Sequence, residues 1–465
     1  MRVVQDTMDI PARVSHRVYL AFLFFYRFLY AFYLSPLRNL RGPLLGKLTL
    51  LRIKLLLGVG LSLWAGRKNY AEYGDIYMSM PNAVTISDPD DIRALLSNPA
   101  ANKAHYYYSI NFVDNKDASV RHRQLRPYLK LTHLAKMEYT ITQQGILWTK
   151  EKWDKLLTKS PTDEIEVNYL DDFVIAAFAI TSMLVYGRRL KELDNPNTDA
   201  AWKLLSRLGK EGKMESKPAD LLQSFIEAED PVTKSKMSSN EIHSECILMM
   251  QAGVDLPSHT LTWLVHFLLL YPQYYRRAGA EVRSQVDPDH IITYNKCREK
   301  LPFVEACLLE ALRIAPAVGV MLPRVSPKGG VMIKGQLISE NMLIIINYAI
   351  ANHHSKHWDR PYEFDLTRYL DNSNARNNIL SFSHGKRTCP GRHMAVWQML
   401  STIANILKDY DLRLPKDFKH LRPDIHNEHG TPKLMESHFF AVIKPTNPKH
   451  DCRMIISKAH NAKNK

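Results

Sequence analysis

One short stretch, SFSHGKRTCPGR at residues 381–392, most constrains what this chain can fold into. It places a single cysteine, Cys389, among basic residues and glycines, directly before a helix-like run. We expect Pro390 to take the first helical position, where its missing N–H costs nothing, so that Cys389 lies at a helix N-terminus that favours a thiolate. Nothing nearby supplies three further zinc ligands. The stretch therefore favours a single thiolate bound to a large cofactor, and the alternative is an incidental thiol on a surface loop.

The residues around the cysteine support a stabilised thiolate. Lys386 and Arg387 add positive potential, and Gly385 and Gly391 allow a sharp turn and a close backbone approach. Backbone amides aimed at the sulfur would tune how strongly it donates electrons.

Composition narrows the class of protein. The 465 residues suffice for one large domain or two to three ordinary ones, and 45% apolar with 23% charged residues indicates a globular chain. The net charge is +15, with the basic residues spread along the chain and no nucleic-acid-binding motif. We therefore expect a membrane face and an acidic protein partner, and no nucleic acid.

The cysteines argue against a disulfide framework. Their number is odd, they are widely separated, and no CxxC occurs, which favours a reducing compartment for the folded part. They are Cys246, Cys297, Cys307, Cys389 and Cys452.

The N-terminal region predicts a membrane anchor at residues 18–34, after a short segment at 1–17. This run has 17 residues with one charge, Arg27, and as a helix it spans about 25 Å, slightly less than a hydrocarbon core of about 30 Å. More basic residues follow the run closely than precede it, which places the rest of the chain on the cytosolic side. The alternative is a buried or interfacial helix. A Pro/Gly-rich hinge is expected at residues 35–47.

Periodicity predicts a mainly α domain with small β-sheets over residues 48–445. Strands are expected in 75–89 and 329–348, and an irregular loop in 358–378. Helices are expected at about 240–271, with a serine cap and Pro272 as its end, and at 301–316 and 390–407. The basic tail at 446–465 is expected to be disordered.

The cysteine stretch resembles the haem-binding loop of the cytochrome P-450 family. It matches F-x-x-G-x-R-x-C-x-G through Phe382, Gly385, Arg387, Cys389 and Gly391. The resemblance implies the cytochrome P-450 fold, haem b (iron protoporphyrin IX) as cofactor, and Cys389 as the metal ligand of its iron. A thiolate ligand pushes electron density toward bound oxygen and favours O–O cleavage.

Further motifs extend the resemblance over roughly residues 40–445. Glu310 and Arg313 match the family's E-x-x-R helix, and the apolar flanks predict that this pair is buried. Arg368 matches a third, loop-borne member, although the motif proline is missing there. The resemblance also assigns to the haem propionates three basic residues, which are otherwise solvated: His122, Arg126 and Arg324.

The long helix departs from the family over the haem, where the usual pattern is A/G-G-x-D/E-T. By resemblance Gly253 leaves room beside the iron and Asp255 helps to pass protons, but Leu256 replaces the threonine and cannot hydrogen-bond. We hypothesise that Pro257, which lacks an N–H, leaves the Gly253 carbonyl free to hold a water in place of the hydroxyl. The alternative is that Pro257 only kinks the helix; Thr260, one turn on, is a weaker donor.

The resemblance predicts a shortened region at residues 188–219, where family members fit two longer helices over the substrate pocket. Only 199–208 has a helical pattern there. Either the roof is reduced, which leaves open a non-catalytic haem-binding remnant, or the chain derives from a defective gene model or splice form. Pocket residues expected by resemblance are 108–112, 318–322 and 439–440.

The motifs together predict a haem-thiolate monooxygenase that resembles fungal, membrane-bound members. It would insert one oxygen atom from O2 into a small lipophilic substrate in secondary metabolism. Electrons would come from NADPH through a flavoprotein reductase, and the chain would be a single-pass protein of the endoplasmic reticulum membrane. The missing threonine keeps a second possibility open, a reductase-independent haem-thiolate isomerase or dehydratase.

Overall fold

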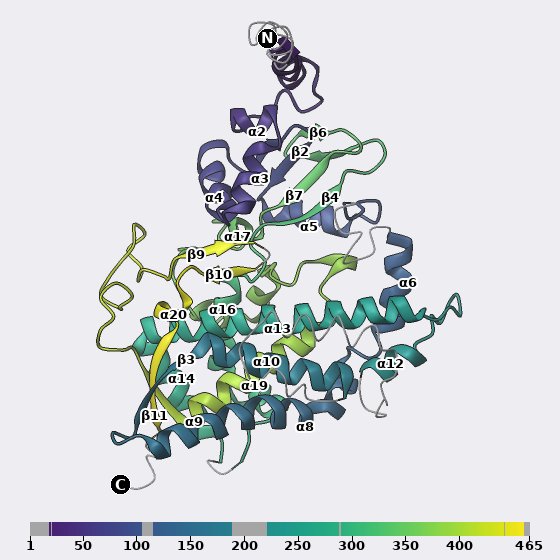
Figure 1. Ribbon diagram of the computed structural model, residues 1–465. Helices are drawn as coiled ribbons and strands as arrows, with labels where there is room; N and C mark the ends of the chain where they lie inside the picture. The colour runs from purple at the N-terminus through teal and green to yellow at the C-terminus, as the bar shows by residue number, and fades with distance from the viewer. Residues whose placement is uncertain are drawn as a thin grey trace, which may run out of the picture.

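The largest layer is a helical body built around one long helix. The computed structural model describes residues 18–19, 21–104, 115–187, 221–287, 290–440 and 442–459. Helix α13 (Ser239–Leu270) crosses the body (Figure 1) and packs against α10 (Tyr169–Tyr186), α16 (Pro302–Ile314) and α19 (Arg392–Asp409). Its predicted start is confirmed, because Ser238 and Glu241 form a reciprocal capping box. Its predicted end is confirmed as well, because the helix ends at Leu270, two residues before Pro272.

A smaller, β-rich lobe lies between the helical body and the N-terminal helix (Figure 1). Its four-stranded sheet has the order β1 (Ile76–Met80), β2 (Ala83–Ile86), β7 (Leu343–Ile346), β4 (Met321–Val325). Only the central pair β2–β7 is parallel within this sheet. Strands β5 (Val331–Ile333) and β6 (Gln336–Ile338) form an adjoining hairpin. The lobe has its own hydrophobic core, separate from that of the helical body.

The remaining elements complete the two layers. They are α2 (Leu44–Leu48), α3 (Leu51–Gly58), α4 (Ser62–Tyr73), α5 (Pro89–Ser97), α6 (Asn115–Leu125), α7 (Leu131–Leu134), α8 (Glu138–Ile141), α9 (Trp148–Lys159), α12 (Leu221–Glu227), α14 (Pro272–Gln285), α15 (Tyr294–Lys300), α17 (Tyr348–Ala351), α18 (Thr367–Leu370), β9 (Ser437–Phe439), β10 (Ile443–Pro445) and α20 (Pro448–Asp451).

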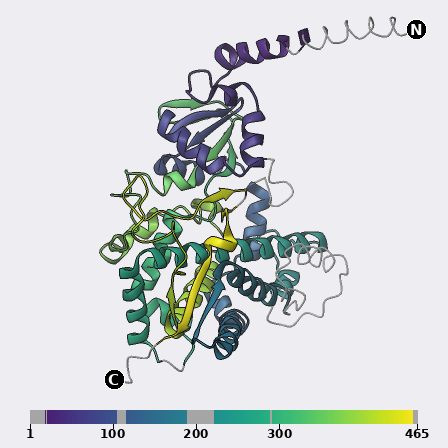
Figure 2. The same ribbon diagram turned by 60° about the vertical axis from the view of Figure 1, so that its left-hand side comes forward.

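The N-terminal apolar segment forms a helix that stands away from the rest of the molecule (Figure 2). Residues 21–34 make a short apolar helix, and its large side chains are mostly exposed. Within the described residues α10 is the helix long and apolar enough to cross a membrane, but 78% of it is buried, as in a core helix. The anchor at 18–34 stays a prediction.

The predicted hinge at 35–47 is packed against the β-lobe. Leu37 and Leu40 are buried in the core of that lobe, and α2 begins inside the segment. A Cβ on Gly42 would lie 2.1 Å from the carbonyl oxygen of Met78, so only glycine fits there. The segment is therefore a fixed connection and not a flexible one.

The prediction of a disordered tail is wrong for residues 446–459. Strand β11 (Arg453–Lys458) is the central strand of a sheet with the order β3 (Glu164–Asn168), β11, β8 (Tyr410–Arg413). Met454 and Ile456 are fully buried on one face. The basic residues that suggested disorder instead bind acids, Arg453 to Glu166 and Asp417. The domain thus continues past residue 445.

Candidate haem-thiolate site

The cysteine loop holds Cys389 directly before α19. The Cys389 amide donates to the carbonyl of Phe382 at 2.9 Å, which closes the loop on itself. Helix α19 begins at Arg392 with Gly391 as its cap, so the prediction that Pro390 takes the first helical position is wrong. The sulfur still faces the helix start.

The electrostatics of the thiol combine burial with nearby donors. Burial raises the pKa of the Cys389 thiol, and a hydrogen bond from the Gly391 amide opposes this rise most strongly. The charges of Arg392 and Lys103 and the amide of Arg392 lower the pKa further. The predicted arrangement of amides aimed at the sulfur is therefore present.

Of the loop glycines Gly385 and Gly391, Gly385 is the one whose geometry requires glycine. Gly385 has φ +68°, and a Cβ there would lie 2.6 Å from the carbonyl oxygen of Leu96 in α5. The loop backbone is thus pressed against α5. A Cβ on Gly391 would lie 4.0 Å from the sulfur of Cys389, an ordinary contact. Arg387 lies in the turn before the cysteine, with its side chain outside the described part.

The sulfur side of the loop faces a cavity of about 710 Å³. Its lining comes from α6, the end of α5 and the cysteine loop, and it includes Cys389, His122 and Arg126. The described lining also contains several further cations and no carboxylate: Arg123, Lys130, Lys386 and Arg392. Such a cavity favours a ligand that carries negative groups.

Arg324 is placed differently from the other predicted propionate partners. It lies on β4, is almost fully buried, and donates to the carbonyl of Leu322 at 2.9 Å. It is not among the residues that line the 710 Å³ cavity, so the described structure does not bring it together with His122 and Arg126 there.

Glu310 and Arg313 form a buried bidentate pair on α16. Both side chains are fully buried, and both N–O distances are 2.7 Å. Arg313 also donates to the backbone carbonyls of Asn352, Pro361 and Glu363. The pair therefore ties α16 to the irregular loop that precedes the cysteine stretch.

The third member of the motif reaches the same carboxylate. Arg368 lies with its Nε 3.3 Å from Oε1 of Glu310, despite the missing motif proline. Tyr369 donates its hydroxyl to Oε2 at 2.8 Å, and the amide of Asp365 donates to Oε1 at 3.1 Å. Sequence reasoning missed the last two partners, although Tyr369 directly follows the arginine.

Gly253 on α13 packs closely against α10. A Cβ on Gly253 would lie 2.8 Å from Cγ2 of Thr181 on α10, so this glycine permits the close packing of α10 and is not shown beside an iron. The Gly253 carbonyl accepts from the Thr181 hydroxyl at 3.1 Å. The Thr181 hydroxyl has one hydrogen and lies closer, at 2.7 Å, to the Ala177 carbonyl of its own helix. The hypothesis that Pro257 leaves the Gly253 carbonyl free for water therefore stays a prediction. No pattern in the sequence pointed to Thr181.

The other candidate residues on α13 are either partly exposed or hydrogen-bonded to carbonyls of the same helix. Asp255 is partly exposed, with an oxygen 4.0 Å from the ammonium of Lys444. Leu256 is partly buried, and the Thr260 hydroxyl donates back to its carbonyl at 2.8 Å. Thr260 thus spends its only donor on the helix.

A second cavity of about 490 Å³ lies between α3, α4 and the four-stranded sheet. Of the predicted pocket residues only Val320 is shown in its lining, with Ile53 and Leu56 of α3. Phe439 is buried, Phe440 is half exposed, and 108–112 lie outside the described residues.

Comparisons with known proteins agree with this site. The cytochrome P450 family profile matches residues 204–434. The monooxygenase helB1 of Aspergillus fumigatus is 36% identical, with 93% of this chain and 84% of the relative covered. The chain belongs to the cytochrome P450 family. This P450 is also 35% identical to helB2 of the same organism, with 93% of this chain and 96% of that relative covered. With such relatives it is a monooxygenase with haem as its cofactor.

Structural comparison supports the same fold. The crystal structure of the cytochrome P450DA heme domain has a TM-score of 0.73 with this P450, covering 88% of this chain and 95% of that chain at 17% identity. The alignment with helB1 spans 487 positions although this P450 has 465 residues, so the relative has segments that this chain lacks. The predicted shortening at 188–219 falls outside the described residues.

The residues of the 710 Å³ cavity fit a haem. The cavity presents one sulfur donor supported by backbone amides, and cations without a carboxylate in the described lining. A thiolate suits iron, and guanidinium groups suit propionates. Cys389 would hold the iron, and His122 and Arg126 lie where they could bind carboxylates.

Proposed function

We propose that this P450 is a membrane-attached, haem-thiolate monooxygenase of fungal secondary metabolism. It inserts one oxygen atom from O2 into a small lipophilic substrate and takes electrons from NADPH through a flavoprotein reductase. The observation that carries the proposal is the partly buried sulfur of Cys389 at the wall of a cation-lined cavity. The fungal relatives named as monooxygenases support the assignment to fungal metabolism.

The cysteine loop sets the properties of the metal ligand. When bound, haem supplies the oxygen chemistry. The amides of Gly391 and Arg392 hold negative charge on the sulfur and moderate its electron donation. The Glu310–Arg313 network fixes the loop before the cysteine, so that the sulfur keeps one position.

Proton delivery depends on α13. Leu256 offers no side-chain hydrogen bond, and Thr260 donates to the helix itself, so neither has a free donor for proton delivery. Asp255 is partly exposed beside Lys444 and can exchange protons with water. We assign the proton-passing role to Asp255.

Exposed apolar residues support contact with a membrane. Those of the N-terminal helix include Phe22, Phe24 and Phe25, and α2 to α4 add Leu44, Leu51, Leu55, Val59 and Trp64. Such a patch exceeds what isolated surface hydrophobes explain. The 490 Å³ cavity lies directly behind α3, where a lipophilic substrate could enter from the bilayer. The endoplasmic reticulum is the proposed membrane.

A reduced, CO-bound spectrum of the purified protein tests the ligand. We expect the thiolate-type absorption in the wild type and its loss in Cys389→Ala, with Cys297→Ala as the matched buried control. Retention of that absorption in Cys389→Ala would refute the assignment. A substrate-shift screen with NADPH and a reductase then tests the reaction, and turnover of a hydroperoxide without either would contradict the reductase dependence.

A further inference from the structure

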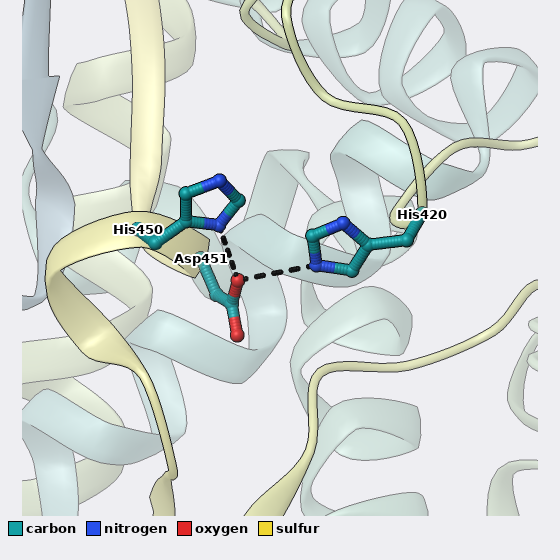
Figure 3. Close-up of side chains that lie close together, drawn as sticks. All are labelled: His420, His450 and Asp451. Atoms are coloured by element: carbon teal, nitrogen blue, oxygen red, sulfur yellow. Dashed lines mark hydrogen bonds and ion pairs between the residues drawn. The ribbon is translucent and has the colours of Figure 1, made fainter.

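Three side chains far from the haem cavity converge on one point near the C-terminal sheet. His420 comes from the loop after β8, and His450 and Asp451 come from α20 (Figure 3). Both imidazoles face the same carboxylate oxygen, with His450 Nδ1 2.8 Å and His420 Nε2 3.4 Å from Asp451 Oδ1. The carboxylate is buried, whereas both histidines reach solvent.

The separations suit a shared cation. One nitrogen from each imidazole and one carboxylate oxygen all lie within 4.8 Å of one another. Two ligands on a tetrahedral zinc ion, each about 2.1 Å from the metal, are about 3.4 Å apart. The His420–Asp451 separation already has this value, and His450 needs to withdraw by well under 1 Å. Two imidazoles and one carboxylate are a ligand set that zinc accepts, with water in the fourth position.

A second cluster, with two carboxylates and one imidazole, shows why this one is preferred. Asp75, Asp88 and His354 also approach one another in the β-lobe. There Lys334 already neutralises both carboxylates, with its ammonium 2.6 Å from Asp88 and 3.2 Å from Asp75. A divalent cation would have to displace this lysine. No lysine ion pair with Asp451 is found among the described residues, and its recorded side-chain partners are the two histidines.

The surrounding charge also permits a cation at Asp451. Arg453, two residues along the chain from Asp451, directs its guanidinium to Asp417 at 2.7 Å and to Glu166 at 3.1 Å. Its Nε donates to the backbone carbonyl of His450 and thereby fixes α20. The arginine is thus held by its own carboxylates.

We propose that His420, His450 and Asp451 bind one zinc-type divalent cation. The ion would join the loop after β8 to α20 and so brace the start of β11, the central strand of the C-terminal sheet. This structural site is independent of the haem and of the proposed reaction. The competing explanation is that the imidazoles only hydrogen-bond to the carboxylate.

Zinc binding to the full-length, haem-loaded protein tests the proposal. After chelator treatment and dialysis, zinc per chain is titrated calorimetrically and counted by atomic absorption. We expect one zinc per chain in the wild type and in the matched control His354→Ala. His420→Ala and His450→Ala should each weaken binding at least tenfold. Unchanged affinity in both variants, or no binding by the wild type, would overturn the proposal.

A second measurement covers variants that fold poorly. Zinc should slow amide hydrogen exchange of the wild-type chain at residues 417–421 and 448–456, and it should leave the loop at residue 354 unchanged. The haem absorption of each variant reports whether its fold is intact. Exchange that does not respond to saturating zinc in these segments would contradict the site.

Discussion

The buried carboxylate of Glu310 offers the sharpest test of how this P450 holds its cysteine loop. Replacing Glu310 with glutamine keeps the shape of the side chain but removes its charge. The Arg313 guanidinium then stays fully buried, with three backbone carbonyls and no counter-ion at its 2.7 Å partner positions. Breaking one partner of a buried ion pair costs about 3–5 kcal/mol. We expect Glu310→Gln to lose stability of that order.

A surface ion pair provides the matched control. Glu164 and Arg413 form a bidentate pair in which each side chain is about 40% exposed. Exposed pairs contribute about 0.2–1 kcal/mol because water screens them. We therefore expect Glu164→Gln to cost less than about 1 kcal/mol, several times less than Glu310→Gln.

A double variant separates the pair from its surroundings. Replacing both members of a buried ion pair with apolar residues often leaves stability unchanged. The corresponding double variant here is Glu310→Leu with Arg313→Met. Here that change also removes the donor to the carbonyls of Asn352, Pro361 and Glu363, and each buried carbonyl left unpaired costs about 1–3 kcal/mol. We expect the double variant to remain clearly destabilised.

The assay is urea unfolding of haem-loaded protein, monitored by helicity and by haem absorption. Both signals should shift to lower urea in Glu310→Gln, with the haem signal shifting at least as far, because Arg313 ties α16 to the loop before Cys389. A loss below about 1 kcal/mol, equal to that of the surface control, would refute the view that this pair is a buried electrostatic anchor.

Three further predictions test other parts of the structure. Gly253→Ala should lower the free energy of unfolding, measured in urea, by about 1–2 kcal/mol because the added Cβ would meet Thr181. The same change should not lower stability in a Thr181→Ala background. Equal losses in both backgrounds would contradict this explanation. Gly385→Ala should weaken haem retention and stability by about 1–3 kcal/mol, because φ is +68° and Leu96 blocks the Cβ, and an unaltered haem titration would count against it. Burial lowers the pKa of His266 to about 3 in the fold. Its contribution to stability is therefore present above the unfolded pKa of about 6.5 and is lost as the pH falls toward 3. The His266→Gln variant should show a weaker pH dependence of stability over that range, measured by urea unfolding at several pH values.

Patterns confined to one element were predictable from the sequence. The cap at Ser238 and the end of α13 before Pro272 both depend on residues within a few positions of one another. The mainly helical class with small sheets is likewise confirmed. The motif spacing on α16 also placed Glu310 and Arg313 one turn apart, where the structure joins them.

Contacts between distant elements were not predictable in the same way. The close approach of Gly253 to Thr181 and the hydrogen-bond contact between them depend on how α10 crosses α13. No local sequence pattern encodes that crossing. The sequence predicted a disordered tail because its basic residues were considered without the acidic residues that bind them in the fold. In the fold its charged residues meet acids on β3 and on the loop after β8, and its alternate apolar residues face the core.

The Gly253–Thr181 contact changes how the missing threonine at position 256 should be understood. The family pattern A/G-G-x-D/E-T suggests that the glycine serves the oxygen site. The absence of the threonine hydroxyl at position 256 then looks like a defect. In this P450 the glycine lets α10 approach, and the Thr181 hydroxyl lies 3.1 Å from the carbonyl that Pro257 cannot reach and 2.7 Å from the Ala177 carbonyl of its own helix. Despite the proline, α13 stays continuous from Ser239 to Leu270. A water that replaces the absent hydroxyl needs polar partners on this turn. Ser258 and His259 each bond to a carbonyl of the same helix, and the Asp255 carboxylate is partly exposed beside Lys444.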